Sequence, residues 1–161
     1  MAEIQLTKGY VAIVDDDDFA WLSQWKWFFT GRYPARSASK EEETAGRPCH
    51  ISMHRAIMGT SSGRIVDHIN GDPLDNRRAN LRFCSLSQNQ HNQRLKRDNT
   101  SGFKGVRRDK KRWMARIQLG PERRYLGSFG SAESAARAYD AAALHHFGEF
   151  ARLNFPEEAA A

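Results

Sequence analysis

Residues 66–93 constrain the fold of this chain more than any other stretch. The sequence Asn-Gly-Asp-Pro at residues 70–73 stands between two short extended segments. Asn-Gly and Asp-Pro favour chain reversal, so the pattern predicts that residues 67–68 and 81–83 lie side by side as an antiparallel ribbon.

A polar helix is predicted directly after the ribbon. Ser85 or Ser87 can cap its N-terminus, because a serine hydroxyl accepts hydrogen bonds from the first free backbone amides of a helix. Asn89 and Asn92 would then share one face, three residues apart. The stretch is therefore predicted to form a small ββα unit with a helix-borne amide near the ribbon.

The polar side chains of this unit suit phosphodiester hydrolysis. That reaction needs a hard cation beside the phosphate and a base for the attacking water. The Asp67 carboxylate and the Asn89 amide oxygen are ligands that Mg²⁺ or Mn²⁺ accepts. His68 titrates near neutrality and leaves the opposite face of the strand from Asp67, which favours a base role over a ligand role.

The spaced pattern resembles a known nuclease motif. Residues 67–68 (Asp-His), residues 80–82 (Asn-Leu-Arg) and Asn89 on a helix are similar to the HNH, or ββα-metal, motif. The likeness is to phage and intron-associated HNH homing endonucleases that carry Asn in place of the last His. His91 and Asn92 lie close enough in sequence to be alternatives to Asn89.

The resemblance implies a role for each motif residue. Asp67 and Asn89 would hold one divalent ion, Mg²⁺ or Mn²⁺. His68 would be the general base, and Asn80 would pin the loop between the strands so that His68 is correctly aimed. The expected products are 5′-phosphate and 3′-hydroxyl ends.

The positive charge is concentrated in the second half of the chain. The formal net charge is +6, and residues 1–66 carry 8 basic and 8 acidic side chains. Residues 94–124 carry 12 basic against 3 acidic side chains, interleaved with aromatic rings. Such a block is typical of a nucleic-acid-binding surface.

Membrane insertion and structural zinc are not expected. No apolar run approaches the length of a membrane span, and the N-terminus lacks the form of a signal peptide. Cys49 and Cys84 are the only cysteines, too few for a four-cysteine zinc site, and they are expected to be free thiols. The expected location is the cytoplasm of a bacterial or phage-infected cell.

The N-terminal region is predicted to be a small α+β region. A hairpin is expected around residues 8–9. The four acids at 15–18 are assigned to a helix cap and first turn, because consecutive side chains cannot converge on one ion. Residues 32–47 are predicted to be an irregular loop, 51–53 a strand and 54–59 a short helix.

His54 and Arg55 begin this short helix, and two interpretations stay open for them. They either contact DNA phosphate or support the active site, or they form a helix start packed under the hairpin. His54 is not assigned as a metal ligand.

The C-terminal region is predicted to form a three-stranded antiparallel sheet packed on one helix. Strands are expected at residues 103–108, 112–118 and 123–127, and a helix from Ser131 to about Phe147. The helix face expected to lie on the sheet consists of small residues with one ring and one leucine: Ala135, Ala138, Tyr139, Ala142 and Leu144.

Residues 101–156 resemble the plant APETALA/ethylene-response-factor DNA-binding domain. Ser-Gly-Phe-Lys-Gly-Val-Arg, Trp-Met-Ala-Arg-Ile and Tyr-Leu-Gly-Ser-Phe occur in the order found there. In that family the sheet lies in the DNA major groove, a standard mode for a β-ribbon that carries arginines. The DNA contacts that the resemblance implies are Lys104, Arg107, Arg108, Trp113, Arg116, Arg123 and Tyr125. Arg116 falls where the plant domains often have Glu and Tyr125 where they have Trp, so their base preference does not transfer.

The sequence therefore predicts an α+β protein with two domains. Residues 1–97 would be the HNH nuclease domain, with its ββα-metal core at about 64–95, and residues 98–161 the DNA-binding domain. The predicted function is metal-dependent cleavage of double-stranded DNA of the homing type. The alternatives are a non-catalytic DNA-binding regulator and an RNA binder, the latter disfavoured because A-form RNA hides its major groove. One such site cuts one strand, so monomer and homodimer both stay open.

Overall fold

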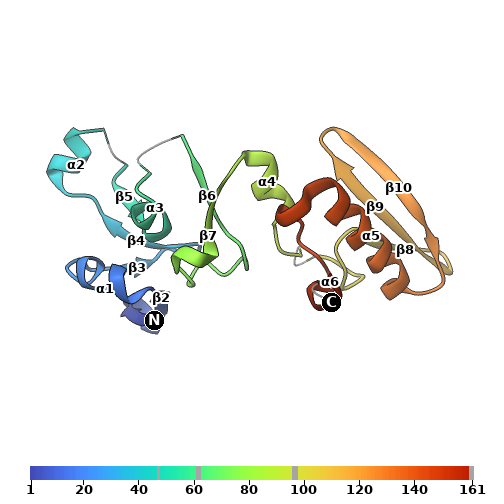
Figure 1. Cartoon of the computed structure of the whole chain (residues 1–161), viewed down its shortest axis with the longest axis horizontal. Coiled ribbons are helices and arrows are strands. Elements are labelled where there is room, and N and C mark those ends of the chain that lie inside the picture. Colours follow the sequence, from blue (N-terminus) through green and yellow to red (C-terminus); the bar gives the residue numbers. More distant parts are fainter. Residues whose placement is uncertain (47, 61–62, 96–97, 160–161) are drawn as a thin grey trace. The chain divides into compact units, whose positions relative to one another are not determined.

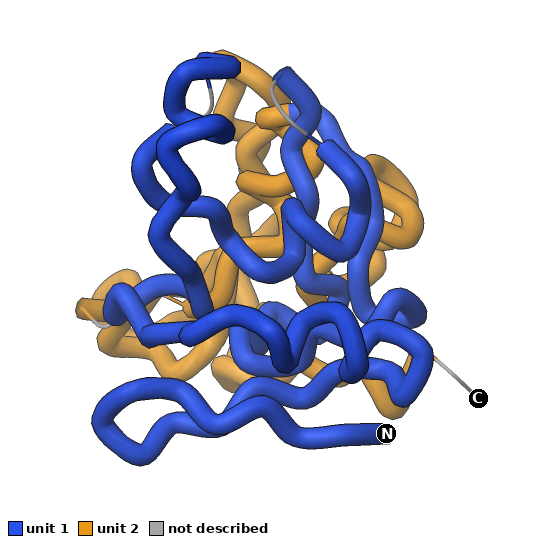
Figure 2. Tube along the Cα trace, turned by 90° about the vertical axis from the view of Figure 1, so that its left-hand side faces the viewer, with its two compact units in different colours: residues 1–85 blue, residues 86–161 orange. Residues whose placement is uncertain are grey.

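The protein contains two compact units. The computed structural model describes residues 1–46, 48–60, 63–95 and 98–159. Contacts divide the chain into Met1–Ser85 and Leu86–Ala161, coloured separately in Figure 2. The helices and small antiparallel sheets in Figure 1 confirm the α+β class. The domain boundary predicted at 97/98 stays a prediction, and Lys96 and Arg97 lie outside the described residues.

The first unit begins with the hairpin predicted around residues 8–9. Strands β1 (Ala2–Gln5) and β2 (Val11–Val14) pair antiparallel around the 3-10 turn η1 (Thr7–Gly9). The last two residues of that turn have φ of 64° and 77°, which closes it tightly. Helix α1 (Asp16–Leu22) follows β2 with three acids in its first turn, where the helix dipole favours negative charge.

A second small sheet in this unit has the order β3-β4-β5. Its strands are β3 (Phe28–Phe29), β4 (Pro34–Ser37) and β5 (His50–Ser52), all antiparallel. Helix α3 (Met53–Ile57) continues directly from β5 and buries Met53 and Ile57. The strand and short helix predicted for residues 51–59 are therefore confirmed.

The irregular loop predicted for residues 32–47 was wrong, because that segment holds β4 and helix α2 (Lys40–Thr44). The Ser39 hydroxyl accepts from the Glu42 amide at 3.2 Å, and the Glu42 carboxylate accepts from the Ser39 amide at 2.9 Å. Glu42 also accepts from both terminal nitrogens of Arg36, at 2.7 and 2.8 Å. This capping box and ion pair stabilise a helix whose sequence lacks a hydrophobic pattern.

The predicted ribbon follows. Strands β6 (Ile65–His68) and β7 (Leu81–Cys84) pair antiparallel, and the 3-10 turn η2 (Arg78–Asn80) leads into β7. The register places Asp67 opposite Arg82. Val66 of β6 and Leu81 of β7 enter the hydrophobic core of the unit. The buried residues of this core are Ile4, Leu6, Ala12, Val14, Leu22, Trp27, Met53, Ile57, Val66 and Leu81.

The second unit contains the predicted three-stranded sheet. Helix α4 (Leu86–His91) precedes β8 (Val106–Asp109), β9 (Arg112–Leu119) and β10 (Glu122–Phe129). The sheet order is β10-β9-β8, with antiparallel pairing throughout. Helix α5 (Ala132–Phe147) packs against all three strands.

The ends of α5 follow the local sequence signals. The Ser131 hydroxyl accepts from the Ser134 amide at 3.1 Å, the predicted N-cap. The helix stops before Gly148, whose φ is 54°. The 3-10 turn η3 (Gly148–Phe150) and helix α6 (Pro156–Ala159) complete the described part of the unit.

Small residues let α5 approach the sheet closely. Ala115 on β9 is fully buried, and so are three α5 alanines: Ala135, Ala136 and Ala143. Leu144 is 48% exposed, so its predicted place on the packed face was wrong. A Cβ on Gly105, which precedes β8, would lie 1.9 Å from the Tyr139 ring, so this close approach requires glycine.

Both cysteines, Cys49 and Cys84, are free thiols. Within the described residues, no helix has the length and apolar character needed to span a membrane.

Candidate active site

Asp67 is a buried carboxylate on β6. Successive residues of a strand point to opposite faces, so Asp67 and His68 leave the ribbon on different sides. The Asp67 carboxylate accepts from Arg82 Nε at 3.2 Å and Arg82 Nη2 at 3.1 Å across the ribbon. The Asp67 and Arg82 side chains are 8% and 11% exposed, so this is a largely desolvated ion pair. A buried carboxylate held beside a cation is a group that a metal ion can also engage.

His68 is buried at the end of β6 and is oriented by a residue eight positions later. Its Nε2 lies 3.3 Å from the side-chain oxygen of Asn76, which is fully buried. The Asn76 amide nitrogen donates to the Pro73 carbonyl at 3.0 Å, so the amide oxygen faces the imidazole. An amide oxygen only accepts, so neutral His68 carries its proton on Nε2 and its lone pair on Nδ1.

Burial keeps His68 in the form that a base requires. It lowers the pKa of His68, an effect partly opposed by the Asn76 hydrogen bond and by the charge of Asp67. The neutral imidazole is therefore the prevailing form at physiological pH.

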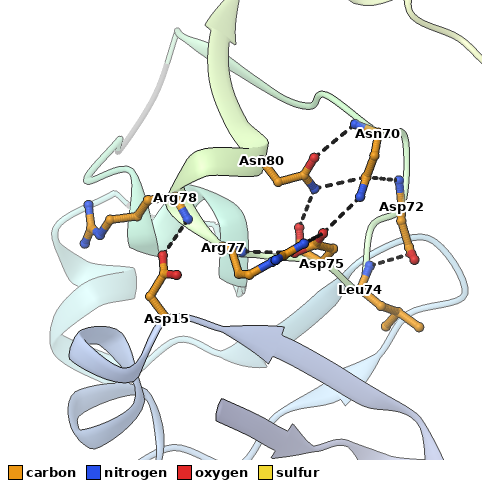
Figure 3. A network of polar contacts seen from close by, with 8 residues as sticks. All are labelled: Asp15, Asn70, Asp72, Leu74, Asp75, Arg77, Arg78 and Asn80. Atoms are coloured by element: carbon orange, nitrogen blue, oxygen red, sulfur yellow. Dashed lines mark hydrogen bonds and ion pairs between the residues drawn. The ribbon is translucent and has the colours of Figure 1, made fainter. Parts of the chain in front are cut away.

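Asn80 holds the loop between the two strands. Its side-chain nitrogen donates to the Asn70 side-chain oxygen at 3.0 Å and to the Asp75 carbonyl at 2.8 Å (Figure 3). Its side-chain oxygen accepts from the Asn70 backbone amide at 3.0 Å. Both ends of one buried amide are therefore used to fix the loop. The predicted consequence, that His68 is correctly aimed, stays a prediction.

Asp75 is the centre of the same network. It accepts from Arg77 at 2.6 and 2.7 Å and from the Asn70 side chain at 2.9 Å. The Arg77 hydrogen bond lowers the pKa of Asp75. Backbone bonds on both sides of Asp75, from Ile13 to Leu74 and from Asn76 to Ile13, each 2.8 Å, tie the loop to β2. The loop that orients His68 is thus supported by the N-terminal hairpin.

Two acids of the run at residues 15–18 bind this loop, although they precede it by about sixty residues in the sequence. The Arg78 guanidinium donates to both carboxylate oxygens of buried Asp18, at 2.7 and 2.8 Å. The Arg78 amide donates to Asp15 at 2.8 Å, as Figure 3 shows. Asp15 and Asp18 therefore support the loop as well as helix α1. No group of three His, Cys, Asp or Glu side chains suited to a metal occurs in the described residues.

Two rings from earlier in the chain enclose the His68 imidazole. His54 meets it edge-on with ring centroids 5.0 Å apart, and Tyr33 stacks on it at 6.0 Å. Tyr33 and His54 also contact each other at 4.7 Å. His54 is buried, and among the residues that the structure describes its Nδ1 has no hydrogen-bond partner. Burial, followed by the charge of His68, lowers the pKa of His54 to about 3.

Acid is therefore expected to destabilise the first unit through His54. Its pKa is about 3 when folded against 6.5 as the ordinary value, so the unfolded chain binds the extra proton. This contribution to stability is complete above about pH 6.5 and is lost as the pH falls from there toward 3. The cost is at most about 1.4 kcal/mol per pH unit.

Urea unfolding of wild type and His54→Phe between pH 7 and pH 4 measures this effect. The variant should lose less stability on acidification, while His50→Phe, at an exposed position, should follow wild type. Identical pH slopes for wild type and His54→Phe would contradict the assignment.

Asn89 lies on α4 and is half-buried. Ser85 directly precedes this helix, while the Ser87 hydroxyl lies 3.0 Å from His91 Nε2. The His91 ring stacks on Phe147 with centroids 3.6 Å apart. His91 is thus engaged within the second unit, which favours Asn89 over His91 as the helix-borne ligand.

Asp67 belongs to the first unit and Asn89 to the second, and the oxygen atoms of both side chains are of the chemical type that a hard divalent ion binds. A carboxylate and an amide oxygen, with water and substrate phosphate in the other positions, are the usual environment of Mg²⁺. The thiols Cys49 and Cys84 are not required for such a site.

Arginines gather on one face of the β8–β10 sheet. Cross-strand partners share a face, and the register pairs Arg116 with Tyr125 and Arg123 with Gln118. Arg107 pairs with Met114, on the same face as Arg116. Arg107, Arg116 and Arg123 also line one hollow of about 430 Å³.

The other predicted DNA contacts are placed differently. Arg108 pairs with Trp113, which packs on the core between sheet and α5, and its guanidinium lies 5.6 Å from that ring. The Lys104 ammonium donates to the backbone carbonyls of His91 and Gln93.

Three residues that contact His68 or Asp67 directly had no role assigned from the sequence: Tyr33, Asn76 and Arg82. Asn76 lies within the motif Leu-Asp-Asn-Arg-Arg at residues 74–78, so the motif could have indicated a role for it. No local sequence pattern marks Tyr33 as a neighbour of His68.

Comparison with known proteins supports two kinds of module. Residues 50–91, from β5 to the end of α4, match a family model described as HNH endonuclease. An uncharacterized HNH endonuclease of Acanthamoeba polyphaga mimivirus is 29% identical over 154 residues, which is 91% of this chain and 76% of that protein. Protein 3.8 of Escherichia phage T7 is 38% identical over 68 residues, 42% of this chain and 56% of that protein.

Plant transcription factors match a shorter part. An ethylene-responsive transcription factor of Arabidopsis thaliana is 52% identical over 59 residues, 35% of this chain. The chain spans 23%, 32% and 29% of the length of three such Arabidopsis factors. No solved structure gives a significant match. The chain therefore carries an HNH endonuclease segment together with an ethylene-response-factor-type domain.

Proposed function

We propose that this protein is a divalent-metal-dependent endonuclease of the homing type that hydrolyses phosphodiester bonds in duplex DNA. One observation carries the proposal. The segment that matches the HNH family holds a buried, neutral imidazole, His68, whose orientation is set by Asn76 and whose neighbour Asp67 is a buried carboxylate. A neutral imidazole can take a proton from water and a carboxylate can hold a divalent ion, which are the two groups that the reaction needs.

Each residue then has a chemical task. A bound Mg²⁺ or Mn²⁺ would supply charge neutralisation at the scissile phosphate and the departing oxygen. Asp67 and Asn89 would hold that ion through oxygen atoms. His68 would take the proton of the attacking water on Nδ1, since Nε2 faces Asn76. Asn80 would keep the loop, and with it the imidazole, in place.

Incubation of supercoiled plasmid with the protein tests the proposal. Nicked or linear products are expected with Mg²⁺ or Mn²⁺ and should vanish with excess chelator. Tight binding of duplex DNA without cleavage in either metal would favour the alternative, a non-catalytic DNA-binding regulator.

The second unit would position the nuclease on DNA. Arg107, Arg116, Arg123 and exposed Tyr125 share one sheet face, as required of a sheet that enters the major groove. Arg108 would contact the DNA backbone from the edge strand β8, while Trp113 on the central strand β9 would support the sheet from the core side. The expected place of action is the cytoplasm of a bacterial or phage-infected cell.

Arg107→Ala and Arg123→Ala are each expected to weaken binding to a preferred sequence by about 1–3 kcal/mol, because an arginine that reads a guanine edge makes two hydrogen bonds. Binding titrations on preferred and scrambled duplexes at two salt concentrations measure this. Arg137→Ala is the control, because Arg137 lies on α5 and pairs with Glu158. Equal loss on both duplexes, with a salt slope reduced by about one, would show phosphate contacts instead.

A further inference from the structure

A lysine of the second unit, Lys104, contacts the C-terminal end of helix α4, which belongs to the same unit. The Lys104 ammonium donates to the His91 carbonyl and, at 2.9 Å, to the Gln93 carbonyl. The last carbonyls of a helix have no partner within it, and they carry the negative end of its dipole. Lys104 therefore satisfies two acceptors and places a cation where the helix favours one.

Lys104 is itself held in place by α5. Its amide donates to the Asn154 side-chain oxygen at 2.7 Å, and its carbonyl accepts from the Asn154 side-chain nitrogen at 3.2 Å. The Asp140 carboxylate on α5 accepts from the Asn154 amide at 2.9 Å and from the Asn154 side-chain nitrogen at 2.9 Å. A continuous set of hydrogen bonds thus runs from α5 through Asn154 and Lys104 to the end of α4.

A ring contact fastens α4 independently. The His91 ring stacks on Phe147, the last residue of α5, with centroids 3.6 Å apart and planes at 10°. Helix α4 also packs on η3, which follows Phe147. A helix of six residues is too short to be stable alone, so these contacts decide its position.

The environment of Lys104 differs from that of a DNA-contacting lysine. Burial lowers its pKa to about 8, with a smaller effect from the charge of Arg152. Its ammonium is directed to protein carbonyls.

We propose that Lys104 and the His91–Phe147 stack are positioning groups that hold α4 against the rest of the second unit, so that this unit sets the position of Asn89 within it as well as delivering the protein to DNA. This inference rests on the proposed function, because it takes Asn89 to be a ligand of the divalent ion. It gives Lys104 a task other than the DNA contact predicted from the sequence.

Lys104→Met in the full chain tests the proposal, because methionine keeps most of the stem and removes the ammonium. The Mg²⁺ concentration for half-maximal plasmid cleavage should rise by about 10–100-fold, the usual effect of losing a group that orients a metal ligand. The affinity for duplex DNA and its salt slope should stay at the wild-type values. Lys111→Met is the matched control, since Lys111 is an exposed lysine of the same unit; it should leave the Mg²⁺ requirement unchanged.

Hydrogen exchange provides a readout that does not depend on cleavage. In Lys104→Met and, separately, in Phe147→Leu, the α4 amides should exchange faster while those of β9 and β10 keep their protection. This holds even if the protein cuts no DNA, in which case the proposed function fails and the anchoring of α4 stands. Unchanged α4 exchange in both variants would overturn the inference. So would a lower DNA affinity of Lys104→Met, with a salt slope reduced by about one and an unchanged Mg²⁺ requirement.

Discussion

His68→Ala is expected to lower the rate of DNA cleavage by about 10²–10⁴-fold, the usual contribution of a general base. Binding to duplex DNA should stay near the wild-type value, because His68 lies in the first unit and the basic sheet in the second. Plasmid cleavage in single-turnover conditions, together with a binding titration, measures both quantities. Cleavage by His68→Ala within a factor of a few of wild type would show that another group is the base.

Two further variants distinguish the effect of losing the base from the effect of changing a nearby residue. Asn76→Ala removes the oxygen that faces His68 Nε2, so the rate should fall while Nδ1 chemistry is still possible. The decrease should therefore be smaller than for His68→Ala. His50→Ala, which changes an exposed histidine of the same unit, should cut like wild type.

Asp67→Ala and Asn89→Ala are each expected to lose nearly all cleavage at Mg²⁺ concentrations that saturate the wild type. Each variant removes an oxygen ligand, and Mg²⁺ tolerates incomplete coordination poorly. Cleavage measured over a range of Mg²⁺ and Mn²⁺ concentrations tests this. The zinc content, expected to be nil, should not change in either variant.

Asn89→His is the informative companion substitution. It restores the commoner form of the motif, so cleavage should be retained with a shifted metal preference, since imidazole favours softer ions than an amide oxygen does. Full activity of Asn89→Ala beside an inactive Asn92→Ala would assign the ligand role to Asn92, directly after the end of α4.

Features that depend on neighbouring residues were predictable from the sequence. The β6–β7 ribbon follows from turn residues between two short alternating segments, and its register follows from burying Val66 and Leu81 together. The limits of α5 follow from Ser131 and Gly148 for the same reason. The α+β class and the presence of both modules were therefore accessible, because caps, turns and motif spacing act over a few residues.

The details of the site were decided by tertiary structure. His68 is oriented by Asn76, which depends in turn on the Pro73 carbonyl and on the pairing of the loop with Ile13 in β2. His54 and Tyr33 meet His68 only in the folded chain, where helix α3 and the β6–β7 ribbon contribute residues to one core. The pKa values follow from that burial, which no local pattern encodes.

Helix α4 shows the distinction most directly. The sequence by itself determined that a short polar helix follows β7, because Ser85 and the polar run after it favour one. It did not determine where that helix packs, because six residues supply too little apolar surface to decide. Lys104 and Phe147, which come 13 and 56 residues after His91, hold α4 against the rest of the second unit. The position of such a short helix depends on residues that donate hydrogen bonds to its last carbonyls and on rings that stack on its own. These residues are far apart in the sequence, and only folding brings them together.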